Sequence, residues 1–234
     1  MPVEVRRHPG ARRLTLRVCK TRRAVVVTVP TQCRMEEAGT FLKSHVDWVR
    51  ERLGNVPEPV AFVDGANIPL RGREHCLRFT GPGRGRPVVS VDELVGELPR
   101  IDVSGRVEHA ARRLKDWLYA EARSDLDGRV TWHARALGVR AKRIGLRDQA
   151  TRWGSCSTTG LLSFSWRLIL APSHVLDYVA AHEVAHLREM NHGPRFWKLV
   201  AQCVPRLEEA RQWLRHEGTE LHRYGAELAS GRRA

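Results

Sequence analysis

The segment that most constrains the fold of this chain is residues 182–192, HEVAHLREMNH, which contains three histidines and a central glutamate. If its first part is helical, His182 and His186 lie one turn apart on the same face, so both imidazoles can bind one metal ion. Glu183 projects beside that face, where a carboxylate can hold a water molecule without binding the metal. The segment therefore predicts a helix that carries a metal site.

The third histidine, His192, restricts where that helix can end. Six residues after His186, an unbroken helix would turn its side chain by roughly 240°, away from the metal. The helix must therefore end between the two residues. Asn191 tolerates the left-handed conformation, and Gly193-Pro194 follows where a helix cannot continue. His192 can then return to complete three protein ligands and leave a fourth position open.

Three histidines with one open position are typical of catalytic zinc. We therefore predict one Zn²⁺ per chain, bound by His182, His186 and His192, with Glu183 as general base on a zinc-activated water in peptide-bond hydrolysis. A simpler interpretation is a surface helix with solvated histidines. The surrounding residues argue against it, because their apolar character indicates a buried helix whose polar groups need partners. They are Val175, Leu176, Val179, Ala180, Val184, Ala185 and Leu187.

The composition sets the class of protein. A chain of 234 residues with 42% hydrophobic residues can bury the core of one large or two small domains. No stretch approaches the length of a membrane span, and the first residues lack the apolar core of a signal peptide. The five cysteines are scattered, without a CxxC pair, which indicates reduced thiols. We expect a cytoplasmic protein without a membrane partner.

The net charge of +14 is concentrated in two places. Residues 1–35 contain nine lysines and arginines against one acid, Glu4: Arg6, Arg7, Arg12, Arg13, Arg17, Lys20, Arg22, Arg23 and Arg34. A second cluster has Asp148 as its nearby acid: Arg135, Arg140, Lys142, Arg143 and Arg147. Such regions attract nucleic acid through counterion release, and we consider nucleic acid a candidate partner of the N-terminal region. The alternative is solvated arginines, since no aromatic residues alternate with the charges as in single-strand binders.

The fold class indicated by the pattern is α+β. Residues 1–104 form a β-rich, basic N-terminal region with one helix, and residues 105–234 form the metallopeptidase domain. In the first region, alternation over residues 14–29 predicts a hairpin, helical spacing over 38–53 predicts the helix, and Pro57 and Pro59 mark a linker. A second hairpin is expected to turn on Asp64-Gly65, with further strands at 76–79 and 88–91.

From residue 105 the hydrophobic period becomes helical and continues to Gly138, with a candidate break near Gly128. Residues 144–146 and 161–170 are typical of strands in a small sheet. Pro172-Ser173 predicts the start of the metal-binding helix, where Asp177 suits the helix dipole. One or two more helices are expected over residues 196–214.

These motifs resemble those of the YgjP-like and SprT-like zincin metallopeptidases, relatives of the Spartan proteases that act on DNA–protein crosslinks. The resemblance rests on RWGSCS (residues 152–157), WRLILAP (166–172), DYVAAHEVAHL (177–187) and NHGPRFW (191–197), and the YgjP-like pattern extends over nearly the whole chain. It implies a zincin-like core of a small sheet and an active-site helix. It also implies zinc held by His182, His186 and His192, with Glu183 as general base. Unlike metzincins, the chain has Glu189 where they carry glycine, which places the turn later, at Asn191.

Several further residues could contribute to the site. Arg152 and Tyr178 are candidates for contacting the substrate or the oxyanion. Trp153 and Trp166 are more typical of core anchors beneath the active-site helix. Phe196 and Trp197 are expected to pack the segment that positions His192. The strand near residues 161–168 could pair with an extended peptide or protein substrate and place its carbonyl at the metal.

Three alternatives stay open at this point. Peptide deformylases combine HExxH with a cysteine ligand, which would assign that role to Cys156 and make His192 incidental. Certain bacterial metal-dependent endoribonucleases use three histidines at this spacing, although they lack the glutamate after the first histidine. Finally, the chain could be a basic nucleic-acid-binding protein with structural zinc, which would require a fourth ligand.

Overall fold

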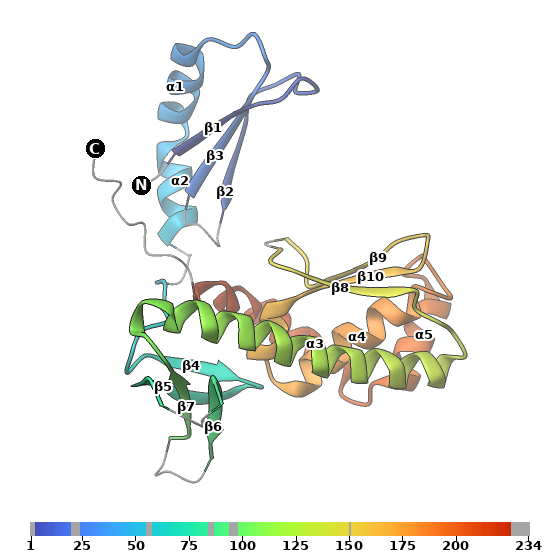
Figure 1. Cartoon of the computed structure of the whole chain (residues 1–234). Coiled ribbons are helices and arrows are strands. Elements are labelled where there is room, and N and C mark those ends of the chain that lie inside the picture. The colour runs from blue at the N-terminus through green and yellow to red at the C-terminus, as the bar shows by residue number, and fades with distance from the viewer. Residues whose placement is uncertain are drawn as a thin grey trace. The chain divides into compact units, whose positions relative to one another are not determined.

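The computed structural model describes residues 3–19, 24–54, 58–83, 87–93, 98–149 and 151–225. Contacts between residues divide the chain into two compact units, one up to Pro59 and one from Val60 to Gly225 (Figure 1). The predicted boundary after residue 104 does not coincide with this division, because residues 60–104 belong to the second unit. The architecture is α+β, as the hydrophobic pattern predicted.

The first unit is a three-stranded sheet with two helices. Strand β3 (Ala24–Val29) lies between β1 (Val3–Arg7), to which it is parallel, and β2 (Thr15–Cys19), to which it is antiparallel. The predicted hairpin of residues 14–29 is therefore confirmed, while its turn, residues 20–23, lies outside the described residues. One helix was expected here, and the structure has two, α1 (Met35–Ser44) and α2 (Val46–Gly54), separated at His45.

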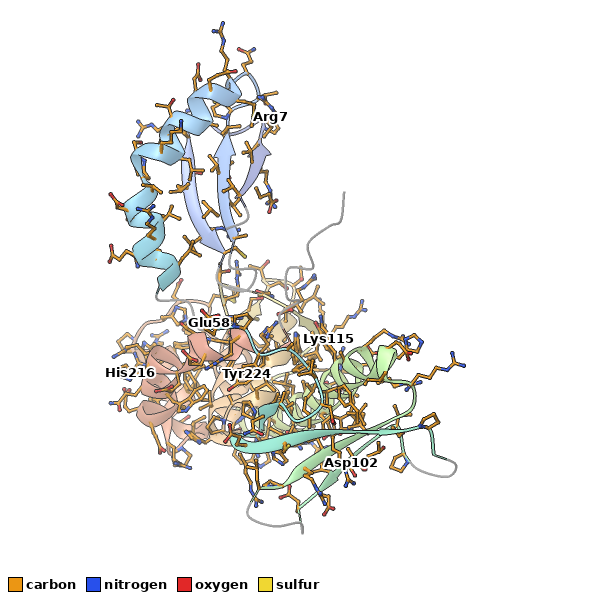
Figure 2. All side chains as sticks on the ribbon, turned by 90° about the vertical axis from the view of Figure 1, so that its left-hand side faces the viewer. Arg7, Glu58, Asp102, Lys115, His216 and Tyr224 are labelled. Atoms are coloured by element: carbon orange, nitrogen blue, oxygen red, sulfur yellow. The ribbon has the colours of Figure 1, made fainter. Side chains whose placement is uncertain are left out.

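Alternate residues of β3 form the core of this unit. Val25, Val27 and Val29 are buried against the helices, together with Ala38 and Val49. One cation of the basic N-terminal region, Arg7, stabilises this unit through hydrogen bonds. Figure 2 shows Arg7 at one end of the sheet, and its guanidinium donates hydrogen bonds to the carbonyl oxygens of Thr31 at 2.6 Å and Cys33 at 2.8 Å. Arg7 therefore fixes the loop that leads into α1.

The second unit begins with a four-stranded sheet in the order β4-β5-β7-β6. Its strands are β4 (Asn67–Leu70), β5 (Arg73–Gly81), β6 (Val89–Asp92) and β7 (Arg100–Ser104). The prediction of a hairpin that turns on Asp64-Gly65 is wrong. The antiparallel hairpin of β4 and β5 turns on Arg71-Gly72, which have φ angles of 52° and 81°. Strand β7 was not predicted, and Pro57 of the expected linker lies outside the described residues.

A long helix, α3 (Ala110–Leu137), then crosses the unit without a break at Gly128. A second sheet lies along its C-terminal half, with β10 (Leu161–Ser165) between β8 (Arg143–Arg147) and β9 (Gly154–Cys156) (Figure 1). The predicted strand of residues 161–170 is only half correct, because residues 166–170 form a 3-10 helix. All five residues of that helix are buried, so they form part of the core.

Three helices complete the second unit: α4 (Ser173–Ala185), α5 (Pro194–Cys203) and α6 (Leu207–His216). Helix α4 starts after Pro172, as predicted, and packs against α3 within one hydrophobic core. A short 3-10 segment, Gly218–Arg223, follows α6. Among the described residues, no helix is both long and apolar enough to cross a membrane.

The four-stranded sheet belongs to the same unit as α4 because its first hairpin contacts the start of that helix. The backbone amides of Arg71 and Gly72 donate to the carbonyl oxygens of Ile169 at 2.7 Å and Leu170 at 3.2 Å. A Cβ atom built on Gly72 would lie 2.7 Å from Cα of Pro172, so only glycine fits. The sheet therefore supports the N-terminus of α4 directly, which explains why no division occurs after residue 104.

Candidate metal centre

Helix α4 carries the first four residues of the HExxH motif, residues 182–185, in its last turn. It ends at Ala185, and residues 186–188 continue as a turn in which Leu187 and Arg188 donate backbone hydrogen bonds to Val184 and Ala185, both at 3.0 Å. The helix thus ends before His192, as required, but the proposed left-handed turn at Asn191 is wrong. Within the described residues, the only non-glycine residue with a positive φ is Arg71.

Helix α5 brings the third histidine into place. Gly193 is extended, with φ −80° and ψ −176°, and Pro194 occupies the first turn of α5, where its missing amide costs nothing. Phe196, on the first turn of α5, is fully buried, and the centre of its ring lies 4.5–4.9 Å from the centres of all three imidazoles. The expectation that Phe196 packs the segment around His192 is confirmed.

The three histidines converge on one point. A ligand nitrogen of His182, of His186 and of His192 can be chosen so that all three lie within 4.8 Å of one another. The Nε2 atoms of His182 and His192 are 3.0 Å apart. Among the described residues, no cysteine or carboxylate joins this group, so the structure places Cys156 outside it and gives no fourth protein ligand.

The outer nitrogens of two of these rings are already engaged. Nδ1 of His186 lies 3.2 Å from the backbone oxygen of Glu189, and Nδ1 of His182 lies 3.5 Å from the Tyr178 hydroxyl. A proton on each Nδ1 leaves Nε2 as a free lone pair, which is the tautomer that a metal ligand needs. Burial lowers the pKa of His182 to about 3 and also lowers that of His186. Both rings are therefore neutral at pH 7, as metal binding requires.

Glu183 is buried beside this group, with only 5% of its surface exposed. Its Oε2 atom has no hydrogen-bond partner among the described residues. Burial raises the pKa of the carboxyl group to about 7, and the positive charge of Arg152 opposes that rise. A buried carboxylate oxygen without a partner, next to three imidazoles, is the arrangement expected where a metal and a water molecule bind. The residues present therefore fit a metal site.

Strand β9 forms the wall next to Glu183, and sequence reasoning missed its first residue. A Cβ atom built on Gly154 would lie 2.5 Å from Oε1 of Glu183. A glycine inside a strand is a recognised sign of close backbone approach, so the signal was present in RWGSCS but was not used. Trp153, just before β9, stacks on His222 with ring centres 5.0 Å apart, which anchors the start of the strand.

The remaining predicted residues occupy distinct positions. Arg152 is exposed and lies two residues before the start of β9. Tyr178 is buried on the Nδ1 side of His182, away from the Nε2 atom that faces the other histidines. Trp166 is fully buried and stacks on Tyr119, which confirms its interpretation as a core anchor. The roles of Arg152 and Tyr178 toward a substrate stay predictions.

Asp177 connects α4 to α3 by hydrogen bonds. It was expected to suit the helix dipole, but its Oδ1 atom accepts hydrogen bonds from Arg129 at 2.5 Å and His133 at 2.6 Å. Both donors belong to α3, so Asp177 joins the metal-bearing helix to the long helix. The sequence contains no signal for this pairing because the partners are more than forty residues apart.

Comparison with known proteins agrees with this geometry. Residues 12–217 match the YgjP-like metallopeptidase domain. Among solved structures, the metallopeptidase zymogen abylysin of Pyrococcus abyssi aligns with a TM-score of 0.36 and 19% identity, over 39% of this chain and 95% of that chain. No curated protein matches the sequence. Because the family match spans most of its length, the chain belongs to the YgjP-like metallopeptidase family.

Proposed function

We propose that the protein is a zinc-dependent endopeptidase in which His182, His186 and His192 hold the metal and Glu183 acts as general base. The observation that carries this proposal is the convergence of three histidines, two of them held with Nε2 free, beside a buried carboxylate oxygen without a partner. Zinc bound there would supply a Lewis acid that polarises a carbonyl group and lowers the pKa of water.

Glu183 would move the proton in this reaction. Its burial places the carboxylate in a site of low polarity, so it accepts a proton from water readily and can pass it to the departing amine nitrogen. The backbone of Gly154 limits the positions that the carboxylate can adopt, because the two groups are in contact. A general base confined in this way keeps its oxygen aimed at one place.

The substrate would bind along β9. Strand β10, which the sequence proposed for this role, is paired on both sides and has no free edge. Among the described residues, β9 pairs with β10 alone, and the register directs the backbone groups of Gly154 and Cys156 away from that partner. An extended peptide could add to this edge by strand pairing, which would bring its scissile carbonyl next to Glu183.

Arg152 and Tyr178 would then have different tasks. Arg152 lies at the entrance of β9, and its charge already acts on Glu183, so it is our candidate for stabilising the oxyanion. The Tyr178 hydroxyl faces Nδ1 of His182, so its task would be to orient that ring. A protein or peptide is the expected substrate class.

The proposal is tested by comparing Glu183→Gln with Glu189→Gln, a matched substitution in the turn after α4. Glu183→Gln should keep zinc, measured by elemental analysis, and should cleave an unfolded protein substrate at least roughly 100-fold more slowly. Glu189→Gln should remain active, because the Glu189 contact with His186 is made by the backbone. Full activity of Glu183→Gln would overturn the mechanism.

The metal site itself is tested by removing single ligands. Alanine in place of His182, His186 or His192 should remove most of the zinc, whereas Cys156→Ala should retain it. Zinc loss from Cys156→Ala with retention by His192→Ala would instead favour the deformylase-like arrangement. Cleavage of RNA rather than protein by the unaltered chain would move the assignment to a nuclease.

A further inference from the structure

A pocket lies in the second unit, between the C-terminal part of α3 and strand β8. Its volume is about 480 Å³, within the usual range for small-molecule sites. Its apolar lining consists of short aliphatic side chains from α3, from β8 and from the loop that joins them: Val130, Ala134, Val139, Ala141 and Ile144. Figure 1 shows β8 along the C-terminal half of α3. The three histidines are not among the residues that line it.

The rim of this pocket is strongly positive. Five cations line it, namely Arg123, Arg135, Arg140, Lys142 and Arg143, against one acid, Asp127. Asp127 already forms an ion pair with Arg123 at 3.6 Å. We call the other four the rim cations, and no carboxylate among the described residues pairs with them. The pocket therefore has four positive charges without a protein counter-charge.

Some arginines elsewhere in this unit pair with acids, and others, such as Arg113 and Arg188, donate to backbone carbonyl oxygens. Arg71 binds Glu121 and Asp125, and Arg167 binds Asp148. A solvated surface would explain any one of the rim cations, and Arg135 also suits the C-terminus of α3. Neither explanation accounts for four exposed cations around one apolar pocket, since like charges gathered in one place repel one another and salt screens this repulsion only in part. An anionic ligand would remove this repulsion.

We infer that this pocket binds a nucleoside polyphosphate. Three of the four rim cations are arginines, whose planar forks match phosphate oxygens in pairs. A triphosphate carries about four negative charges near neutral pH, counting one to two on its terminal phosphate, which balances the four rim cations. The aliphatic floor supplies a surface for the nucleoside.

The test measures binding to the zinc-loaded full chain by equilibrium dialysis. The probes are ATP, inorganic triphosphate and a single-stranded oligonucleotide, all without added Mg²⁺, so that the triphosphate keeps its full negative charge. The pocket variant combines Arg135→Gln, Arg140→Gln and Arg143→Gln. A matched control combines Arg73→Gln, Arg112→Gln and Arg206→Gln, which removes the same charge from exposed positions outside the pocket. Urea unfolding of both variants verifies that they fold.

We expect ATP to bind the unaltered chain and the control alike, and to bind the pocket variant at least about tenfold more weakly. Lysine at the same three positions should restore only part of the affinity, because the charge returns without the fork. Inorganic triphosphate should bind more weakly than ATP, since it cannot use the apolar floor. Triphosphate binding equal to that of ATP would overturn the nucleoside assignment.

Two further results would overturn the proposal. One is loss of ATP binding in the control to the same extent as in the pocket variant, which would show a general charge effect. The other is pocket-dependent binding of the oligonucleotide without binding of ATP, which would assign the pocket to nucleic acid. A third variant, with Arg12, Arg13 and Arg17 changed to glutamine, separates this pocket from the basic N-terminal region. It should bind ATP normally, and loss of ATP binding there would locate the ligand in the first unit.

Discussion

The side chain of Glu183 occupies space that only glycine at position 154 leaves open. The backbone of β9 touches the carboxylate, and the other carboxylate oxygen has no partner among the described residues. The position of Glu183 thus depends on a residue that the HExxH motif does not contain. At this scale, the missing side chain of one strand residue controls where the Glu183 carboxylate can lie.

Gly154→Ala should therefore impair catalysis more than folding. The new methyl group would lie 2.5 Å from Oε1 of Glu183, so the carboxylate or the strand must move. Displacement by about 1 Å can cost a factor of the order of 100 in rate. We expect kcat to fall at least roughly tenfold while zinc is retained, measured on an unfolded protein substrate.

The matched control is Gly145→Ala in β8, the other edge of the same sheet. A Cβ atom there would lie 3.4 Å from the Ser163 hydroxyl, the limit of ordinary contact. This variant should keep nearly full activity. Equal loss of activity in both variants would show that the sheet as a whole is sensitive, and would contradict the specific contact with Glu183.

At the scale of elements, α3 and α4 are joined by a carboxylate whose pKa is shifted. Burial is the largest single influence on the pKa of Asp177, and it raises that pKa. The hydrogen bonds and charges of His133 and Arg129 together outweigh burial, so the net pKa lies below 3.8. The folded-state pKa is thus lower than the unfolded one. The ionised carboxylate stabilises the fold above about pH 4, and this contribution is lost as pH falls through the folded pKa.

Asp177→Asn should accordingly lower the free energy of unfolding by about 1–3 kcal/mol at pH 7, measured in urea. The difference from the unaltered chain should narrow as pH falls below about 4, because protonation removes the same charge. Asp116→Asn, on an exposed position of α3, serves as the control and should change little. A difference that persists unchanged at low pH would contradict the electrostatic explanation.

The middle of α3 offers a prediction of the opposite sign. Gly128 was a candidate break, but the helix continues through it, and nothing lies within 4 Å of a Cβ atom built there. Gly128→Ala should raise the free energy of unfolding by about 0.5–1 kcal/mol, because alanine loses less backbone entropy. Gly138→Ala should destabilise, since that residue ends the helix with a φ of 64°. Thermal unfolding measures both.

The elements show which parts of the fold the sequence could predict. Spacing was sufficient for α4 and for the pairing of His182 with His186, because two side chains four residues apart on a helix lie on one face. It failed for the β4–β5 turn because Arg71 is not a residue expected at positive φ. Tertiary contacts hold Arg71 there, through Glu121 at 2.7 Å and Asp125 at 2.8 Å. Residues 161–170 were predicted to form one strand because both halves are apolar, so the hydrophobic pattern does not show where the strand ends.

At the scale of the molecule, the second unit is larger than the sequence predicted. The four-stranded sheet shares the core of α3, with Ile68, Leu77, Ile101 and Val103 each at most 1% exposed. A break after residue 104 would uncover this face. Sequence patterns locate strands and helices one at a time, so they could not show which sheet covers which helix.

Two fragments of the chain test whether the second unit needs the four-stranded sheet to fold. Residues 60–225 should fold alone and unfold cooperatively in urea, because this fragment keeps the whole core. Residues 105–225 should lack a cooperative transition, since they leave the apolar face of α3 uncovered. Circular dichroism and urea titration distinguish the two. A cooperative transition in the shorter fragment would restore the boundary after residue 104.

The two ends of the second unit are tied together. Val60 donates its amide to the carbonyl of Arg223 at 2.9 Å, and Gly225 donates to the carbonyl of Val60, also at 2.9 Å. Chains that enter and leave a unit at one place tolerate new connections there. Residues 60–225 could therefore be inserted into a surface loop of an unrelated host protein, or rejoined end to end and opened elsewhere. In either form the three histidines and Glu183 should keep their arrangement.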